Sequence, residues 1–159
     1  MSTMIAYAKN FLGIPYRWWD PAVSCSDETG PFYAVEGGEV PLDVVQTGHL
    51  NCAGFLNVLC RKAGIAIPGA KERHFYAGGT VLWWEFFDAN GMLEPFDPLK
   101  EYPEGSILLR QYSSEEDQGH IAVCAGGKTI LHSWPEKGVV LEEWDPSYYT
   151  KVVVGFFKN

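Results

Sequence analysis

The pattern of apolar residues changes near Gly105, and this change limits the possible folds more than any other feature of the chain. Before it, apolar residues recur at helical spacing in three segments, residues 3–12, 52–63 and 79–89. After it, five short segments have the character of strands, namely 106–112, 119–125, 128–134, 138–144 and 151–157. Because short links join successive strands, they predict an antiparallel meander. We therefore expect an α+β fold, with N-terminal helices packed on a C-terminal antiparallel sheet of about five strands.

The length of 159 residues suits one domain with its own core, so we expect residues 1–159 to form a single domain. A hydrophobic content of 47% is typical of a globular protein. Residues 21–50 contain Pro, Gly and acidic residues without a sustained period. They predict a long excursion with at most a short helix, and a loop of this length inside a domain is usually functional or mobile.

The net charge of −8 argues against nucleic acid and anionic membranes as partners, because both reward Lys and Arg. A neutral or cationic substrate fits this charge better. No stretch approaches the ~20 apolar residues of a membrane span. The N-terminus lacks the basic region and apolar run of a signal peptide, although a mature chain whose leader was removed would look the same. We expect a monomer that is cytoplasmic by default, or exported by a route that the sequence does not show.

The four cysteines are expected to be reduced thiols. Cys52 and Cys60 lie eight residues apart in one predicted helix, so their Cα atoms would be about 12 Å apart. That separation is beyond the reach of a disulfide. Cys60 and Cys124 are interpreted as small buried hydrophobic residues, and Cys25 has no clear role.

Three residues of the chain together could catalyse a reaction. Cys52 lies where a loop gives way to the helix 52–63, and His120 and His132 lie in successive predicted strands. A thiol, a base and a second imidazole that orients the base are the parts of a cysteine hydrolase. A helix dipole contributes at most ~2 kcal/mol, or about one and a half pKa units, to thiolate formation. A full thiolate at neutral pH therefore also needs an imidazolium beside it, which favours a Cys-His-His triad.

The hairpin between the two histidines decides whether they can cooperate. A two-residue loop at Gly126 and Gly127 would place His120 and His132 on opposite faces of the sheet. A three-residue loop that begins at Ala125 would set them directly opposite each other, with Cβ atoms about 4.5–5.5 Å apart. Because a three-residue hairpin needs a left-handed residue that glycine supplies without strain, we predict the three-residue loop.

Three motifs of the chain resemble those of the NlpC/p60 family of cell-wall cysteine peptidases. Residues 13–18, Gly-Ile-Pro-Tyr-Arg-Trp, resemble its Gly-x-Pro-Tyr-x-Trp-Gly-Gly segment. Residues 51–55, Asn-Cys-Ala-Gly-Phe, resemble its Asp-Cys-Ser-Gly-Phe nucleophile motif. Residues 119–123, Gly-His-Ile-Ala-Val, with His132 twelve residues after His120, resemble its two histidine strands. Residues 99–108 are also similar to its Leu-x-Pro-Gly-Asp segment.

The resemblance implies a papain-like fold and hydrolysis of an amide bond in a peptidoglycan stem peptide through an acyl-enzyme, without a cofactor or metal. It implies that Cys52 is the nucleophile, that His120 is the general base and then acid, and that His132 orients His120. Tyr16 would lie near the oxyanion site, beside the backbone N–H of Cys52.

The substrate side of the resemblance is less complete. Where the family has Asp and Ser around the cysteine, this chain has Asn51 and Ala53. In members that bind a free peptide amine, those two side chains help to hold it, so these two substitutions leave a different amide substrate open. Trp18 could line the substrate cleft or belong to the core.

Other functions stay open at this point. An acyltransferase or deamidase on the same scaffold, or a catalytically idle binding module, would use the same fold. A zinc site drawn from His49, Cys52, His120 and His132 lacks the paired short-range ligands of structural zinc. His49 and His74 are interpreted as surface or loop histidines, and the aromatic residues of 79–89 as core or groove wall.

Overall fold

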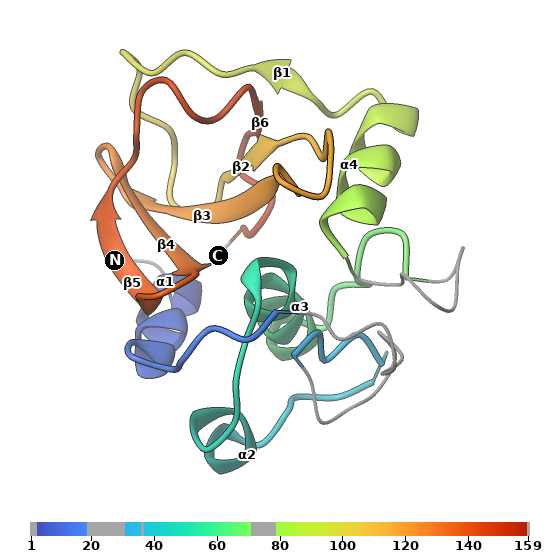
Figure 1. Ribbon diagram of the computed structural model, residues 1–159, viewed down its shortest axis with the longest axis vertical. Helices are drawn as coiled ribbons and strands as arrows, with labels where there is room; N and C mark the ends of the chain where they lie inside the picture. Colours follow the sequence, from blue (N-terminus) through green and yellow to red (C-terminus); the bar gives the residue numbers. More distant parts are fainter. Residues whose placement is uncertain (1–2, 19–30, 36, 71–78, 159) are drawn as a thin grey trace.

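The computed structural model describes residues 3–18, 31–35, 37–70 and 79–158 (Figure 1). The helices of this part are α1 (Thr3–Ala8), which continues into the 3-10 turn η1 (Lys9–Phe11), α2 (Leu42–Gln46), α3 (Cys52–Ala63) and α4 (Thr80–Ala89). They confirm the three predicted helices, and α2 is the short helix expected within the excursion. Residues 19–30 of that excursion, including Cys25, lie outside the described residues, as does His74.

Local signals at both ends fix the length of α3. The Asn51 side chain accepts a hydrogen bond from the Gly54 N–H at 2.7 Å, which satisfies one of the free donors of the first turn. Gly64 ends the helix in the left-handed region, with φ of 69°. Arg61 and Lys62 lie in the last turn, where positive charge is favourable. The helix therefore begins at the cysteine because Asn51 caps it there.

The sheet is antiparallel and has six strands in the order β1-β6-β2-β3-β4-β5. Their bounds are β1 (Glu94–Pro95), β2 (Ile107–Arg110), β3 (His120–Gly126), β4 (Thr129–Trp134), β5 (Gly138–Glu143) and β6 (Lys151–Val153). The meander prediction is right for β2 to β5 and wrong for the last strand, because β6 pairs with β2 instead of β5. The short β1, which pairs with β6, was not predicted.

The position of β6 has a physical reason in the segment before it. Trp144 and Tyr149 are 5% and 6% exposed, because residues 144–149 cross one face of the sheet and cover it. The chain thereby reaches the far edge of β2. There the Thr150 N–H donates to the Leu109 carbonyl at 2.9 Å. Burying two aromatic rings and pairing an open edge both favour this route over a simple fifth hairpin strand.

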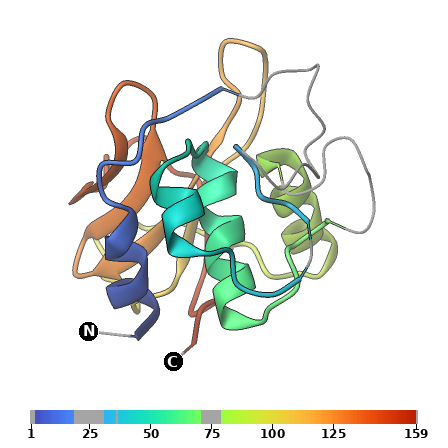
Figure 2. The ribbon, with the colours of Figure 1, turned by 90° about the horizontal axis from the view of Figure 1, so that it is seen from below.

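Alternate residues of the strands pack into two different clusters. One face contributes to the main core with α1, α3 and α4, through Ile107, Leu109, Ile121, Val123, Leu131, Val139 and Val153. The opposite face contributes to a smaller cluster under the loops, through Leu108, Ala122, Cys124, Ile130 and Val152. In Figures 1 and 2, α1 and α3 lie on the same side of the sheet, and α3 runs through the middle of the molecule.

The described helices include none that is long and apolar enough to cross a membrane.

In α4, Trp83 and Phe87 are fully buried, and Trp84 and Phe86 pack partly buried against the main core. The aromatic residues of this helix are therefore core residues.

Gly54 in the first turn of α3 offers a direct test of how the helix is seated. A Cβ at this position would overlap the carbonyl group of Pro31, whereas a Cβ at Gly38 would meet nothing within 4 Å. Overpacking of this kind costs about 1–3 kcal/mol, so Gly54→Ala should lower the free energy of unfolding by that amount. Gly38→Ala, the control, should leave stability unchanged or slightly higher. Urea unfolding measures both, and equal stability of Gly54→Ala and the wild type would contradict the packing described.

Candidate active site

The segment before α3 joins three distant parts of the chain. The Leu50 N–H donates to the Pro15 carbonyl at 3.1 Å, and the Arg17 N–H donates to the Leu50 carbonyl at 3.3 Å. These two bonds form a parallel bridge between Tyr16 and Leu50. The Ser133 hydroxyl of β4 also donates to the Leu50 carbonyl, at 3.0 Å. Tyr16 and the start of α3 are thereby fixed beside the sheet.

The start of α3 lies where β3 and β4 diverge. The β3–β4 ladder runs from Gly126↔Thr129 to Val123↔Leu131 and does not continue toward His120. In place of a further strand pair, Ser133 bonds to Leu50, and the Ile121 N–H faces the Cys52 sulfur. The open end of this hairpin therefore receives the N-terminus of the helix that carries the thiol.

The Cys52 thiol is buried and surrounded by donors. Its sulfur lies 3.4 Å from the Thr80 hydroxyl, in the first turn of α4. Burial raises the pKa of the thiol, and the Thr80 hydroxyl and the backbone N–H groups of Ala53, Ile121 and Cys52 lower it without cancelling that effect. The raised pKa favours the protonated thiol at neutral pH, and a thiol must lose its proton before it can act as a nucleophile.

His120 and His132 contact each other through their ring nitrogens. His120 Nε2 lies 2.7 Å from His132 Nδ1, and the ring centroids are 4.9 Å apart at an interplanar angle of 74°. Both residues are buried, with exposed fractions of 2% and 3%. They lie on the same face of the sheet, as the hairpin argument predicts.

The predicted register of that hairpin is nevertheless wrong. Cys124 pairs with Ile130 rather than with Lys128, and Ala125 is an extra residue before the Gly126↔Thr129 pair. The turn residues are Gly127 and Lys128, and the positive φ of Gly126 and Gly127, 108° and 58°, permits this bulged turn. The partner shifts by two residues, which preserves the face because side chains alternate with a period of two.

The two histidines are therefore diagonal rather than directly opposite. Diagonal residues have Cβ atoms about 7–8 Å apart, a gap that two imidazole rings can span. Continuing the observed register would set His120 opposite Trp134, and the two ring centroids are indeed 4.8 Å apart. The bulge thus makes room for an end-to-end hydrogen bond between the rings, with Trp134 packed beside both.

Burial keeps both imidazoles neutral. Burial and the nearby His132 hold the pKa of His120 well below its ordinary value. Burial also lowers the pKa of His132, and this effect outweighs the opposing effect of the Glu142 carboxylate. His132 Nε2 lies 3.1 Å from Glu142 Oε1, and Lys137 Nζ lies 2.9 Å from Glu142 Oε2. A polar chain therefore runs from His120 through His132 and Glu142 to Lys137 at the surface.

Cys52 and His120 line the same cleft, which has a volume of about 1090 Å³. Its walls come from the 13–18 segment, the first turns of α3 and α4, the 110–120 segment, the end of β4 at Trp134 and the segment before β6 at Tyr148. Cys52, the candidate nucleophile, and His120, the candidate base, thus share one cleft, which is large enough for a small peptide.

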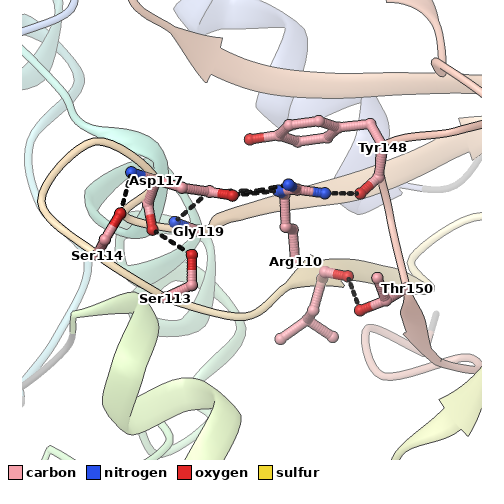
Figure 3. A network of polar contacts seen from close by, with 8 residues as sticks. Arg110, Ser113, Ser114, Asp117, Gly119, Tyr148 and Thr150 are labelled. Atoms are coloured by element: carbon pink, nitrogen blue, oxygen red, sulfur yellow. Dashed lines mark hydrogen bonds and ion pairs between the residues drawn. The ribbon is translucent and has the colours of Figure 1, made fainter.

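Figure 3 shows the polar network that holds one wall of this cleft. The Arg110 guanidinium donates to Asp117 Oδ2 at 2.7 Å and to the Tyr148 carbonyl at 2.9 Å, and it lies 4.7 Å from the centroid of the Tyr148 ring. The Asp117 carboxylate also accepts from the Gly119 N–H at 3.3 Å. These contacts tie the loop before His120 to β2 and to the segment before β6.

The remaining predicted site residues all line this cleft, but they present different groups to it. Tyr16 has its hydroxyl near the Cys52 sulfur, and burial and that thiol raise the pKa of Tyr16. Trp18 is 55% exposed and packs edge-on against Tyr16, so it belongs to the cleft rim and not to the core. Asn51 uses its side-chain oxygen to cap α3, and Ala53 presents only a methyl group.

Several residues at the site were missed by sequence reasoning. Thr80, Arg110 and Tyr148 belong to none of the motifs of the chain. Glu142 had a usable signal, because the short link at residues 135–137 fixes the β4–β5 register and sets Glu142 diagonal to His132. Among the described residues, no group of three or more His, Cys, Asp or Glu side chains is arranged to hold a metal ion, and His49 is exposed.

Comparisons with known proteins identify the family and the fold of this chain. The family model described as "NlpC/P60 family" matches residues 30–158. A search of curated proteins found no match. Three similar solved structures are the NlpC/p60 domain of the peptidoglycan hydrolase SagA, the hypothetical invasion protein Rv1477 of Mycobacterium tuberculosis, and RipD of the same organism, described as a non-catalytic NlpC/p60 domain protein adapted to peptidoglycan binding.

The fold is shared with these structures at low sequence identity. SagA is 18% identical with a TM-score of 0.52, and the match covers 94% of this chain and 94% of that one. Rv1477 is 16% identical with a TM-score of 0.57, covering 95% of this chain and 59% of that one. RipD is 14% identical with a TM-score of 0.55, covering 95% and 93%. With the family model matched over most of its length, this chain belongs to the NlpC/P60 family and has its papain-like fold.

Proposed function

We propose that this chain is a cysteine hydrolase that cleaves an amide bond in peptidoglycan stem peptides through an acyl-enzyme at Cys52. The observation that carries the proposal is that the buried Cys52 thiol and His120 line one cleft, with His132 hydrogen-bonded to His120 from behind. Membership of the NlpC/P60 family and the likeness to SagA, a peptidoglycan hydrolase, support the substrate class.

The proposed reaction begins with proton transfer. His120 takes the proton of the Cys52 thiol as the sulfur attacks the amide carbonyl, and the carbonyl oxygen gains negative charge in the tetrahedral intermediate. The backbone N–H of Cys52 and the Tyr16 hydroxyl are the donors proposed to stabilise that oxygen. His132, bonded to His120 Nε2, orients the ring so that its other nitrogen serves as the base.

Collapse of the intermediate completes the cycle. His120 returns its proton to the nitrogen of the leaving amine, the C–N bond breaks, and a thioester to Cys52 remains. His120 then takes a proton from water as the water oxygen attacks the thioester carbonyl. The C–S bond breaks, the acid is released, and His120 returns the proton to the Cys52 sulfur. The Asn51 side-chain oxygen caps the helix, and the Ala53 side chain has no polar group. We therefore propose that other cleft residues bind the free amine of the substrate, or the group that a different amide substrate carries in its place.

The nucleophile assignment predicts a specific loss in Cys52→Ala. Turnover of defined muropeptides should fall to background, a loss on the order of 10⁴-fold or more, because no acyl-enzyme can form. Cys124→Ala is the matched control, since Cys124 is buried in the smaller cluster away from the cleft and its loss should leave turnover near the wild-type value. Mass spectrometry of the digests measures both.

Each other outcome identifies a different function. Undiminished turnover in Cys52→Ala would contradict the nucleophile assignment. Binding of muropeptides by the wild type without cleavage would instead indicate an idle binding module, the role described for RipD. Products that carry an added amine or alcohol in place of water would indicate an acyltransferase on the same scaffold.

The protonation states predict the pH dependence of the reaction. Activity requires neutral His120, and burial and the neighbouring His132 hold its pKa well below the ordinary value of 6.5. Since lowering the pH must first protonate that ring, kcat/KM should stay constant as the pH falls to 6.5 and decline only below it. A pH profile of kcat/KM measures this, and an acid limb with its midpoint at or above 6.5 would contradict it.

A further inference from the structure

We propose that Glu142 is a positioning residue that selects the tautomer of His132 and thereby decides which ring nitrogen of His120 can accept the Cys52 proton. The inference rests on the proposed cysteine chemistry and extends the Cys-His-His set by one residue of β5.

The sheet register delivers Glu142 to His132. On β4 and β5, Ile130 pairs with Glu142 and His132 pairs with Val140, so the two side chains share a face and lie diagonal to each other. Glu142 Oε1 lies 3.1 Å from His132 Nε2. The imidazole is almost wholly buried, with 4% of its side chain exposed, while 31% of the Glu142 side chain is exposed. Glu142 is thus the outer partner of a buried ring.

The charge state of Glu142 follows from its other neighbour. Lys137, from the turn before β5, places its ammonium nitrogen 2.9 Å from Glu142 Oε2. An ion pair of this kind keeps the carboxyl ionised, and an ionised carboxylate can only accept hydrogen bonds. The contact between Glu142 and His132 therefore requires a proton on His132 Nε2.

That proton determines the rest of the chain of contacts. A neutral His132 with its proton on Nε2 has a bare Nδ1, which can only accept. His120 Nε2, 2.7 Å away, must then carry a proton and donate it to His132 Nδ1. A neutral His120 with its proton on Nε2 has a bare Nδ1, and this is the nitrogen left to take the proton of the Cys52 thiol.

Without Glu142 the opposite arrangement becomes available. His132 could carry its proton on Nδ1 and donate to His120 Nε2, which would force the proton of His120 onto Nδ1. The nitrogen that must act as base would then already be protonated. Trp134 packs against both rings, at centroid distances of 4.8 and 5.5 Å. It limits the access of water molecules that could exchange protons with the rings and restore the first tautomer.

Glu142 also favours the charged intermediate. When His120 takes the thiol proton, the imidazole pair becomes positive. Burial disfavours that charge, while the carboxylate of Glu142 lies next to the pair and compensates it. The charged groups on the His132 side are Glu142 and Lys137. On the other side, Arg110 of β2 is the direct strand partner of His120 and forms an ion pair with Asp117. The uncharged rings of Trp134, Tyr148 and Tyr149 surround His120.

The test uses graded variants of Glu142 in the full chain. Glu142→Leu removes the acceptor, and Glu142→Gln keeps the shape but has an amide that can accept or donate. Glu143→Leu and Glu143→Gln are the matched controls, because Glu143 is the next residue of β5, is exposed and points to the other face. Circular dichroism checks that each variant folds.

The direct measurement is the tautomer of each imidazole, read from nitrogen-15 chemical shifts by NMR. In the wild type and both Glu143 variants, His120 and His132 should each carry the proton on Nε2. Glu142→Leu should shift His132 toward the Nδ1 tautomer, and Glu142→Gln should give a mixture. Unchanged tautomers in both Glu142 variants would overturn the proposal.

Kinetics on muropeptides separate positioning from a general structural effect. We expect kcat of Glu142→Leu to fall roughly 10- to 100-fold, which is no more than the lower end of the roughly 10²–10⁴-fold contribution of a general base, while KM stays within about twofold. Glu142→Gln should fall between the leucine variant and the wild type. A loss confined to KM, or an equal loss in Glu143→Leu, would contradict the assignment.

The two proposals can fail separately. If the wild type cleaves no stem peptide, the proposed substrate is wrong, but the tautomers and the rate of Cys52 alkylation by iodoacetamide still test Glu142 without any substrate. Slower alkylation in Glu142→Leu than in Glu143→Leu at the same pH supports the proposal. Equal rates together with wild-type tautomers would refute it.

Discussion

The backbone of Leu50 is the junction on which the site depends. Its N–H and carbonyl bond to the 13–18 segment, and the same carbonyl accepts from Ser133 of β4. These contacts hold the start of α3 against the open end of the β3–β4 hairpin, where the two strands have stopped pairing. Cys52 and its cap follow directly in the chain, so one residue's hydrogen bonds bring Tyr16, the thiol and the histidine strands to the same cleft.

Burial decides how such a site can work. A helix N-terminus lowers the pKa of a thiol, but the Cys52 sulfur is enclosed, and desolvation prevails over the helix and the nearby donors. The same desolvation keeps His120 neutral. These shifts favour a neutral thiol and a neutral imidazole at rest, whereas the sequence favours a preformed thiolate–imidazolium pair. The positions of the protons on His132 and His120 then matter, because only an unprotonated ring nitrogen can serve as a base.

The sequence predicts the large features of this arrangement because their signals are local. The asparagine cap, Gly64 and the apolar face predict α3, and the alternation of apolar residues predicts β2 to β5. The parity of the hairpin predicts that His120 and His132 share a face. The bulge at Ala125 could not be predicted, because two adjacent glycines allow several turns of similar energy. The position of β6 depends on long-range burial of Trp144 and Tyr149, and the contact of Thr80 with Cys52 depends on how α4 packs.

The central claim is that Cys52, activated by the His120–His132 pair, forms a covalent acyl intermediate. Acid-quenched mass spectrometry of the protein mixed rapidly with a stem peptide tests this claim most directly. We expect a transient mass increase equal to the acyl part of the peptide, mapped by proteolysis to the fragment that carries Cys52 and absent from Cys52→Ala. Steady product release with no adduct on Cys52 at any quench time, under conditions in which the thioester is stable, would contradict it.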